Sequence, residues 1–150
     1  MSKLTINESA STFTDVVVLD YVALQAAGNG GQIKIGTIPA GGAIDLVMVD
    51  ESVAFAGTST LVIDIGTTVG DPDEFIDALD VDAMTVPVFN TGDLMVKSGS
   101  TTTYLGGALP VKPVAADTPI YLEVTDAAIA SATAGKLTVG LRILDLRQFA

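Results

Sequence analysis

The sequence predicts an all-β fold, a single-domain β-sandwich or jelly roll with one short helix. Several short segments alternate apolar and polar residues, which is the pattern of half-buried strands. Clusters of Gly, Asn, Pro and Asp separate these segments at the roughly 8–12-residue spacing that is typical of sandwiches. The chain has 150 residues, the size of one domain with a real core, and no linker divides it. We therefore expect one domain over 1–150, with an N-terminal arm over 1–12 and a C-terminal strand or tail over 136–150.

The first half of the chain predicts three strands. Residues 13–24 form a weakly periodic strand or pair of strands, and the Gly- and Asn-rich residues 26–31 form a loop. A second strand begins at Ile33, and Pro39–Gly42 turns the chain into a third, as in a hairpin. On the third strand one apolar face is expected to continue through Ile44, Leu46 and Met48.

The second half predicts three more strands and the helix. The strands are expected over residues 61–65, 119–125 and 136–146, where apolar residues alternate with polar ones. Residues 71–79 favour a helix of about two turns, because Asp71 suits an N-cap and Pro72 the first helical position. The alternation slips by one residue at Ile143, so we expect either a β-bulge or a change of partner to another subunit.

The composition argues against most catalytic and nucleic-acid-binding functions. The chain contains no His and no Cys, so the usual general base, thiolate catalysis and thiolate metal sites are missing. Its net charge is −11, and its seven basic residues are scattered, which makes nucleic acid and anionic membranes poor partners. The N-terminus lacks the pattern of a secretory signal, and no apolar run approaches the length of a membrane span. We expect a protein that is not an enzyme and needs no cofactor.

The acidic run from Asp71 to Asp82 is the best candidate for a metal site. Asp71, Asp73 and Asp77 supply the oxygen ligands that Ca²⁺ prefers, but their spacing does not match an EF-hand loop. Helix capping and a solvated acidic face explain the same residues, and we prefer this interpretation, with no metal bound. Carboxylate pairs for glycoside hydrolysis, built on Glu51, Glu74 or Glu123, lack a recognisable motif.

Both apolar ends of the sequence suggest contacts with other chains. Residues 141–149 stay apolar almost to the last position, whereas free tails are usually polar. Terminal strands often join oligomers, so segments 16–24 and 141–149 are the expected contact regions. The residues we expect to contact another chain are Val16, Val18, Leu144, Leu146 and Phe149.

The pattern of strands and turns over residues 30–143 resembles small structural proteins of tailed-bacteriophage virions, in particular jelly-roll cement, or decoration, proteins. The segments that carry the resemblance are 31–41, 60–66, 71–75, 118–124 and 134–140. The resemblance implies a protein made in the host cytoplasm that binds the major capsid protein on the outer surface of the virion as a homotrimer. The alternative is a jelly-roll module of a tail or fibre that contacts a host glycan or another tail protein.

Overall fold

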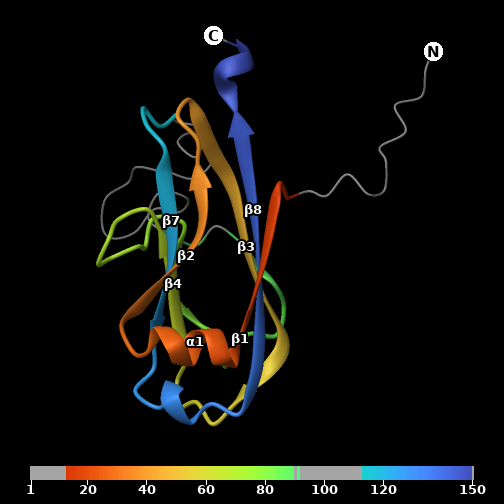
Figure 1. The fold of residues 1–150 in the computed structure, drawn as a ribbon. Coiled ribbons are helices and arrows are strands. Elements are labelled where there is room, and N and C mark those ends of the chain that lie inside the picture. Colours follow the sequence, from red (N-terminus) through yellow and green to blue (C-terminus); the bar gives the residue numbers. More distant parts are fainter. Residues whose placement is uncertain (1–12, 90, 92–112, 150) are drawn as a thin grey trace, which may run out of the picture.

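In the computed structural model, which describes residues 13–89, 91 and 113–149, two four-stranded antiparallel sheets pack against each other (Figure 1). Sheet A contains, in spatial order, β1 (Asp15–Asp20), β8 (Ala134–Asp145), β3 (Gly42–Ala56) and β6 (Val88–Phe89). Sheet B contains β2 (Gly31–Ile38), β7 (Thr118–Thr125), β4 (Val62–Gly66) and β5 (Ile76–Asp80). The helical elements are α1 (Tyr21–Ala27), η1 (Ile129–Ser131) and η2 (Leu146–Phe149). In this part of the chain no helix is long and apolar enough to cross a membrane.

The strand order confirms the all-β sandwich and is that of a jelly roll. Strands pair from the outside of the sequence inward: β1 with β8, β2 with β7, β3 with β6, and β4 with β5. A long antiparallel hairpin that is rolled up places successive pairs in alternate sheets, as here. β1 and β2 are joined by α1, which contacts β1, β2 and β8 at one end of the sandwich (Figure 1).

The core lies between the two sheets and is built from the inward side of each strand. Alternation along the strands predicts this side well, because successive side chains point to opposite faces. The central residues are fully buried: Val47, Val49, Leu137, Val139 and Leu141 in sheet A, and Ile63, Ile65, Ile120, Leu122 and Val124 in sheet B. Burial of each such side chain contributes about 1.5–3 kcal/mol, so these ten residues dominate the stability of the sandwich.

The prediction of a helix over residues 71–79 is wrong. Ile76–Asp80 forms β5, which pairs with β4, and the backbone N–H of Phe75 donates to the Ile65 carbonyl at 2.9 Å. Phe75 and Ile76 are both buried in the core. An isolated helix of two turns is marginal in water, so pairing with β4 and burial of these two side chains outweigh the favourable N-terminal residues.

The helix lies instead in α1, where the sequence favoured a strand followed by a loop. Asp20 is its N-cap and accepts a hydrogen bond from the Ala23 N–H at 3.0 Å. Gly28 ends it with φ 78 and donates to the Leu24 carbonyl. Leu24 is completely buried, and the Gln25 side chain donates to the Ala132 carbonyl at 2.8 Å, so packing, this hydrogen bond and the two caps hold the short helix. The Asp and Gly flanking a seven-residue segment were the signals that could have located it.

The turn at residues 39–42 does not make the expected hairpin. β2 pairs with β7 in sheet B, and β3 pairs with β8 in sheet A, so the turn carries the chain from one sheet to the other. Gly41 adopts φ 77, and its N–H donates to the Val114 carbonyl at 2.8 Å. Because a sandwich needs such crossings, a hairpin-like turn signal does not by itself show that its two strands pair.

A β-bulge in β3 moves the apolar pattern by one residue. The register shifts between Ile44 and Leu46, which leaves Asp45 as the extra residue. Ile44 is therefore buried, but Leu46 and Met48 point outward, so the single face expected for these three residues is wrong. The residues that point inward after the bulge are Val47 and Val49.

The C-terminal strand follows its expected pattern and then ends in a short helical turn. The bulge in β3 lies opposite Ile143, where the sequence left open a bulge or a change of subunit. The residues after β8 form η2, and the Leu146 N–H donates to the Gly41 carbonyl at 3.2 Å. The N-terminal arm expected over 1–12 lies outside the described residues.

Candidate functional site

A row of apolar residues crosses the outward side of sheet A from one edge to the other. Val16 of β1 pairs with Gly140 of β8, Gly140 with Met48 of β3, and Met48 with Phe89 of β6. Cross-strand partners share a face, and neighbouring strands lie about 4.8 Å apart. The four residues therefore form one continuous stripe, in which Val16 is 54% exposed and Phe89 49% exposed.

Other apolar side chains widen this row into a surface. Val18 is 55% exposed and lies two residues along β1 from Val16, on the same side. Farther along β3, Val53 pairs with Lys136 of β8 and is 47% exposed. Four of the seven exposed large hydrophobic side chains in the described residues thus belong to this one side of sheet A. We call the surface formed by Val16, Val18, Met48, Val53 and Phe89 the outer A face.

Phe13 covers the middle of the outer A face at Gly140. A Cβ built on Gly140 would lie 2.7–2.8 Å from atoms of the Phe13 ring, so the ring rests directly on this glycine. A side chain at this position would force the ring away from the sheet. Glycine is therefore required by the close approach of the ring rather than by the backbone conformation.

We expect Gly140→Ala to destabilise the fold by about 1–2 kcal/mol, the usual cost of inserting a methyl group into a tightly packed site. Chemical denaturation of the variant measures this. In a Phe13→Ala background the same glycine substitution should cost much less, because the ring that it meets is gone. An equal cost in both backgrounds would contradict the contact.

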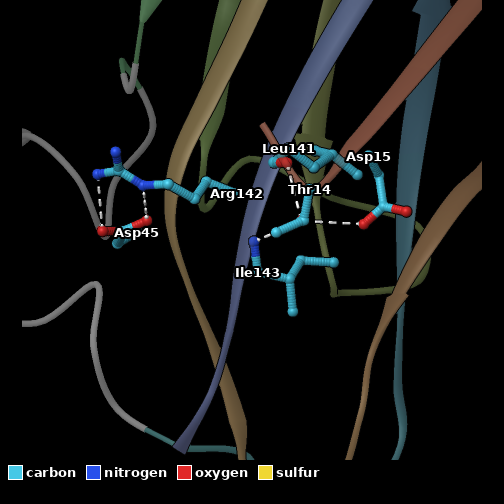
Figure 2. A network of polar contacts seen from close by, with 6 residues as sticks. All are labelled: Thr14, Asp15, Asp45, Leu141, Arg142 and Ile143. Carbon is cyan, nitrogen blue, oxygen red and sulfur yellow. Dashed lines mark hydrogen bonds and ion pairs between the residues drawn. The ribbon is translucent and has the colours of Figure 1, made fainter. Parts of the chain in front are cut away.

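Polar contacts at one end of the outer A face join β8 to its two neighbours, β3 and β1 (Figure 2). Arg142 makes a two-pronged ion pair with Asp45, with N–O distances of 2.7 and 2.8 Å. This hydrogen bonding raises the pKa of Arg142 and so favours its charged form. The Thr14 hydroxyl bridges the strands by donating to the Leu141 carbonyl and accepting from the Ile143 N–H. The bulged Asp45 thereby neutralises the one arginine beside the apolar row.

The outward side of sheet B has the opposite character. Glu123 and Asp64 are direct cross-strand partners, and Gln32 donates to Glu123 at 2.7 Å. The pKa of Asp64 is raised by its burial and by the charges of Asp77 and Glu123, against the hydrogen bond from the Ala78 N–H. A sheet face in contact with water normally carries such polar and charged residues. Sheet B therefore has the face expected of a solvated surface, whereas on sheet A polar residues such as Thr138 and Asp50 lie beside an exposed apolar row.

Several carboxylates that the sequence singled out hold loops. Glu74 accepts from the Thr67 N–H at 2.7 Å and from the Thr68 hydroxyl. Burial raises the pKa of Glu74, but these hydrogen bonds lower it more. Asp82 accepts from the Leu61 N–H at 2.9 Å. In the described residues no group of three or more acidic side chains is arranged to hold a metal ion, and this includes Asp71, Asp73 and Asp77.

Asp126 is the one buried charged residue of the described part, at 2% exposed. Its carboxylate accepts from the Ser59 N–H, the Ser59 hydroxyl and the Ala128 N–H, at 3.0, 2.5 and 2.7 Å. Its own N–H donates to the Asn29 side chain at 2.9 Å. Asp126 thus joins three loops at one end of the sandwich. Because these groups are all structural, we assign it no chemical role.

The comparisons with known proteins add one distant likeness. No protein-family model and no curated protein matches the chain. Among solved structures, the chain is similar to one in a structure titled "Capsid of Ralstonia phage GP4". The two are 17% identical, the match covers 88% of this chain and 85% of that chain, and the TM-score is 0.48. A likeness at this level assigns neither a function nor a site.

The structure gathers three of the five contact residues predicted from the sequence. Val16 and Val18 lie on the outer A face, and Leu144 follows Arg142 by two residues on the same side of β8. Leu146 lies in η2, half-buried. Phe149 ends η2, and its side chain is outside the described part of the chain. Sequence reasoning missed Met48, Val53 and Phe89, because their place depends on shifts of register in β3 and on the pairing with β6.

Proposed function

We propose that this protein is a non-enzymatic structural protein of a phage virion that binds the outer surface of the capsid as a cement protein. The outer A face carries the proposal, since an exposed apolar row that crosses all four strands of a sheet is characteristic of a protein interface. The sequence resemblance to phage cement proteins supplies the kind of partner. The absence of His and Cys from the whole sequence supports a structural role over a catalytic one.

The charge distribution supports a partner other than a second copy on the outer A face. The chain carries a net charge of −11, so two copies repel each other at long range, whereas a basic partner is attracted. In this arrangement the outer A face meets the capsid, and the acidic side of sheet B points to solvent. The homotrimer then forms through other contacts, for which Leu146 in η2 is the proposed residue.

Capsids of the phage that carries this gene, prepared without the protein, provide the test. We expect saturable binding in a sedimentation assay, and a trimer of the free protein in analytical ultracentrifugation. A monomer that does not bind capsids would refute the proposal. Binding to isolated tails, but not to heads, would favour the tail or fibre module instead.

A further inference from the structure

The four edge strands of the sandwich differ in how well they are protected from pairing with another chain. Edge strands expose unpaired backbone groups, and proteins protect them with short length, charges or bulges. In the described part of the chain, β6 has two residues. β5 contains the charged Asp77 and Asp80, a shift of register in its pairing with β4, and Ala78 at φ 46. β2 has an exposed Lys34 next to a shift of register. Three edges are thus unsuited to accept a further strand.

β1 is the least protected of the four, because its charged residues, Asp15 and Asp20, lie only at its two ends. Its six residues pair with β8 without any shift, from Asp15 opposite Leu141 to Asp20 opposite Lys136. The four residues between the two aspartates are Val, Val, Val and Leu, with no charge and no proline. Within the part of the chain that the structure describes, no strand pairs with its other edge. A regular, apolar, open edge of this kind is a template for an incoming strand.

We infer that an extended segment of the capsid partner adds to sheet A beside β1, an inference that rests on the proposed function. The acids at both ends of β1 define the chemistry of that segment: alternating apolar residues with Lys or Arg near each end. The outward side chains of the added strand lie next to Val16 and Val18 and so extend the outer A face. The added strand thus forms hydrogen bonds with the open backbone edge of β1 and also covers the exposed valines.

A second copy of this chain fits the edge less well. In an antiparallel pair of β1 strands related by a twofold axis, opposite residues share a face, so the axis passes at a residue that pairs with itself, such as Val17. Asp15 then lies opposite Leu19 and Asp20 opposite Thr14, so neither acid meets a basic residue. The net charge of −11 on each copy also opposes this pairing.

Hydrogen exchange measured by mass spectrometry on the free and the capsid-bound protein tests the inference. In the free protein, the outward amides of β1 should exchange fast, and on the bound protein they should slow at least 100-fold. The amides at the outer edge of β5 should not change. If the protein binds capsids but the β1 amides stay unprotected, the inference is overturned and the proposed function stands. If the protein does not bind capsids at all, the proposed function is refuted. Protection already present in the free protein, together with dimers, would show that a second copy occupies the edge.

Charge reversal gives an independent readout. Asp15→Lys should weaken capsid binding at least tenfold, because it places a positive charge beside the basic end of the incoming segment. Asp77→Lys is the matched control, since it makes the same change at an exposed position of the opposite edge strand, β5, and should leave the affinity unchanged. Equal effects of the two variants would show that only the total charge matters. Thermal melting of both variants verifies that they fold.

Discussion

Replacing Asp126 with alanine is expected to destabilise the fold by about 3 kcal/mol, because it removes the acceptor of three hydrogen bonds at a buried site. The N–H groups of Ser59 and Ala128 would then lose the acceptor that they have in the folded protein. Thermal denaturation should show a decrease in Tm of about 6–12 °C for a chain of this size.

The pH dependence of this effect follows from the pKa of Asp126. Burial raises this pKa, but the hydrogen bonds from Ser59 and Ala128 lower it more, so the net shift is downward from 3.8. The folded protein therefore favours the ionised form. The stabilisation is fully present above the unfolded pKa of 3.8 and is lost as the pH falls through the lower pKa of the folded state. The difference in stability between wild type and Asp126→Ala should thus shrink in strong acid.

Asp80→Ala is the control for this prediction. Asp80 is exposed and accepts one hydrogen bond, from the Ala83 N–H at 3.2 Å, so its loss should cost less than about 1 kcal/mol. Asp126→Asn should fall between the two, since the amide keeps one acceptor oxygen but loses the charge. Equal effects at Asp80 and Asp126 would show that the buried network does not stabilise the ends of the sandwich.

The sequence predicted the sandwich because its core strands obey local rules. Leu61, Ile63 and Ile65 alternate with polar neighbours and are buried as expected, and the same holds for residues 120–124. Such alternation depends only on the pleat of a strand, so it can be read without knowledge of the partner. It cannot show which strands pair, and this is why the turn at 39–42 was taken for a hairpin.

Both helix errors arose where a tertiary contact decided between two locally acceptable structures. Residues 71–79 have good helix-starting residues, but pairing with β4 and burial of Phe75 and Ile76 favour a strand. Residues 21–27 are short and apolar enough for a strand, but the caps at Asp20 and Gly28 favour a helix. Secondary structure in such segments depends on the surroundings, which a single sequence does not display.

The outer A face was predictable only in part. The exposed valines of β1 were proposed as contacts from their position near one end of the chain, and the structure places them beside residues that are far away in sequence. Phe89 and Met48 reach the same surface through the β3–β6 pair and the bulge at Asp45. A surface assembled from four strands leaves no local motif, in contrast to a catalytic or metal site.

Replacing Val16 and Val18 together with lysine should weaken capsid binding at least 100-fold while leaving the fold intact. Both side chains are more than half exposed in the free protein, so the substitution costs little stability, and lysine is well tolerated on an edge strand. In the complex each valine loses its remaining contact with water, and burial of a whole valine contributes about 1.5–3 kcal/mol. Two buried lysine charges add a further cost, and 2.8 kcal/mol already corresponds to about 100-fold in Kd.

The chain offers a matched control for this experiment. Val22 on α1 and Val69 in the loop after β4 are 53% and 73% exposed, and neither lies on the outer A face. The Val22→Lys/Val69→Lys variant makes the same chemical change and the same change in net charge, so it should bind capsids as the wild type does. If both pairs of substitutions weaken binding equally, then charge rather than the outer A face governs the interaction. If neither does, the partner does not bury β1, and the apolar surface of sheet A needs another explanation.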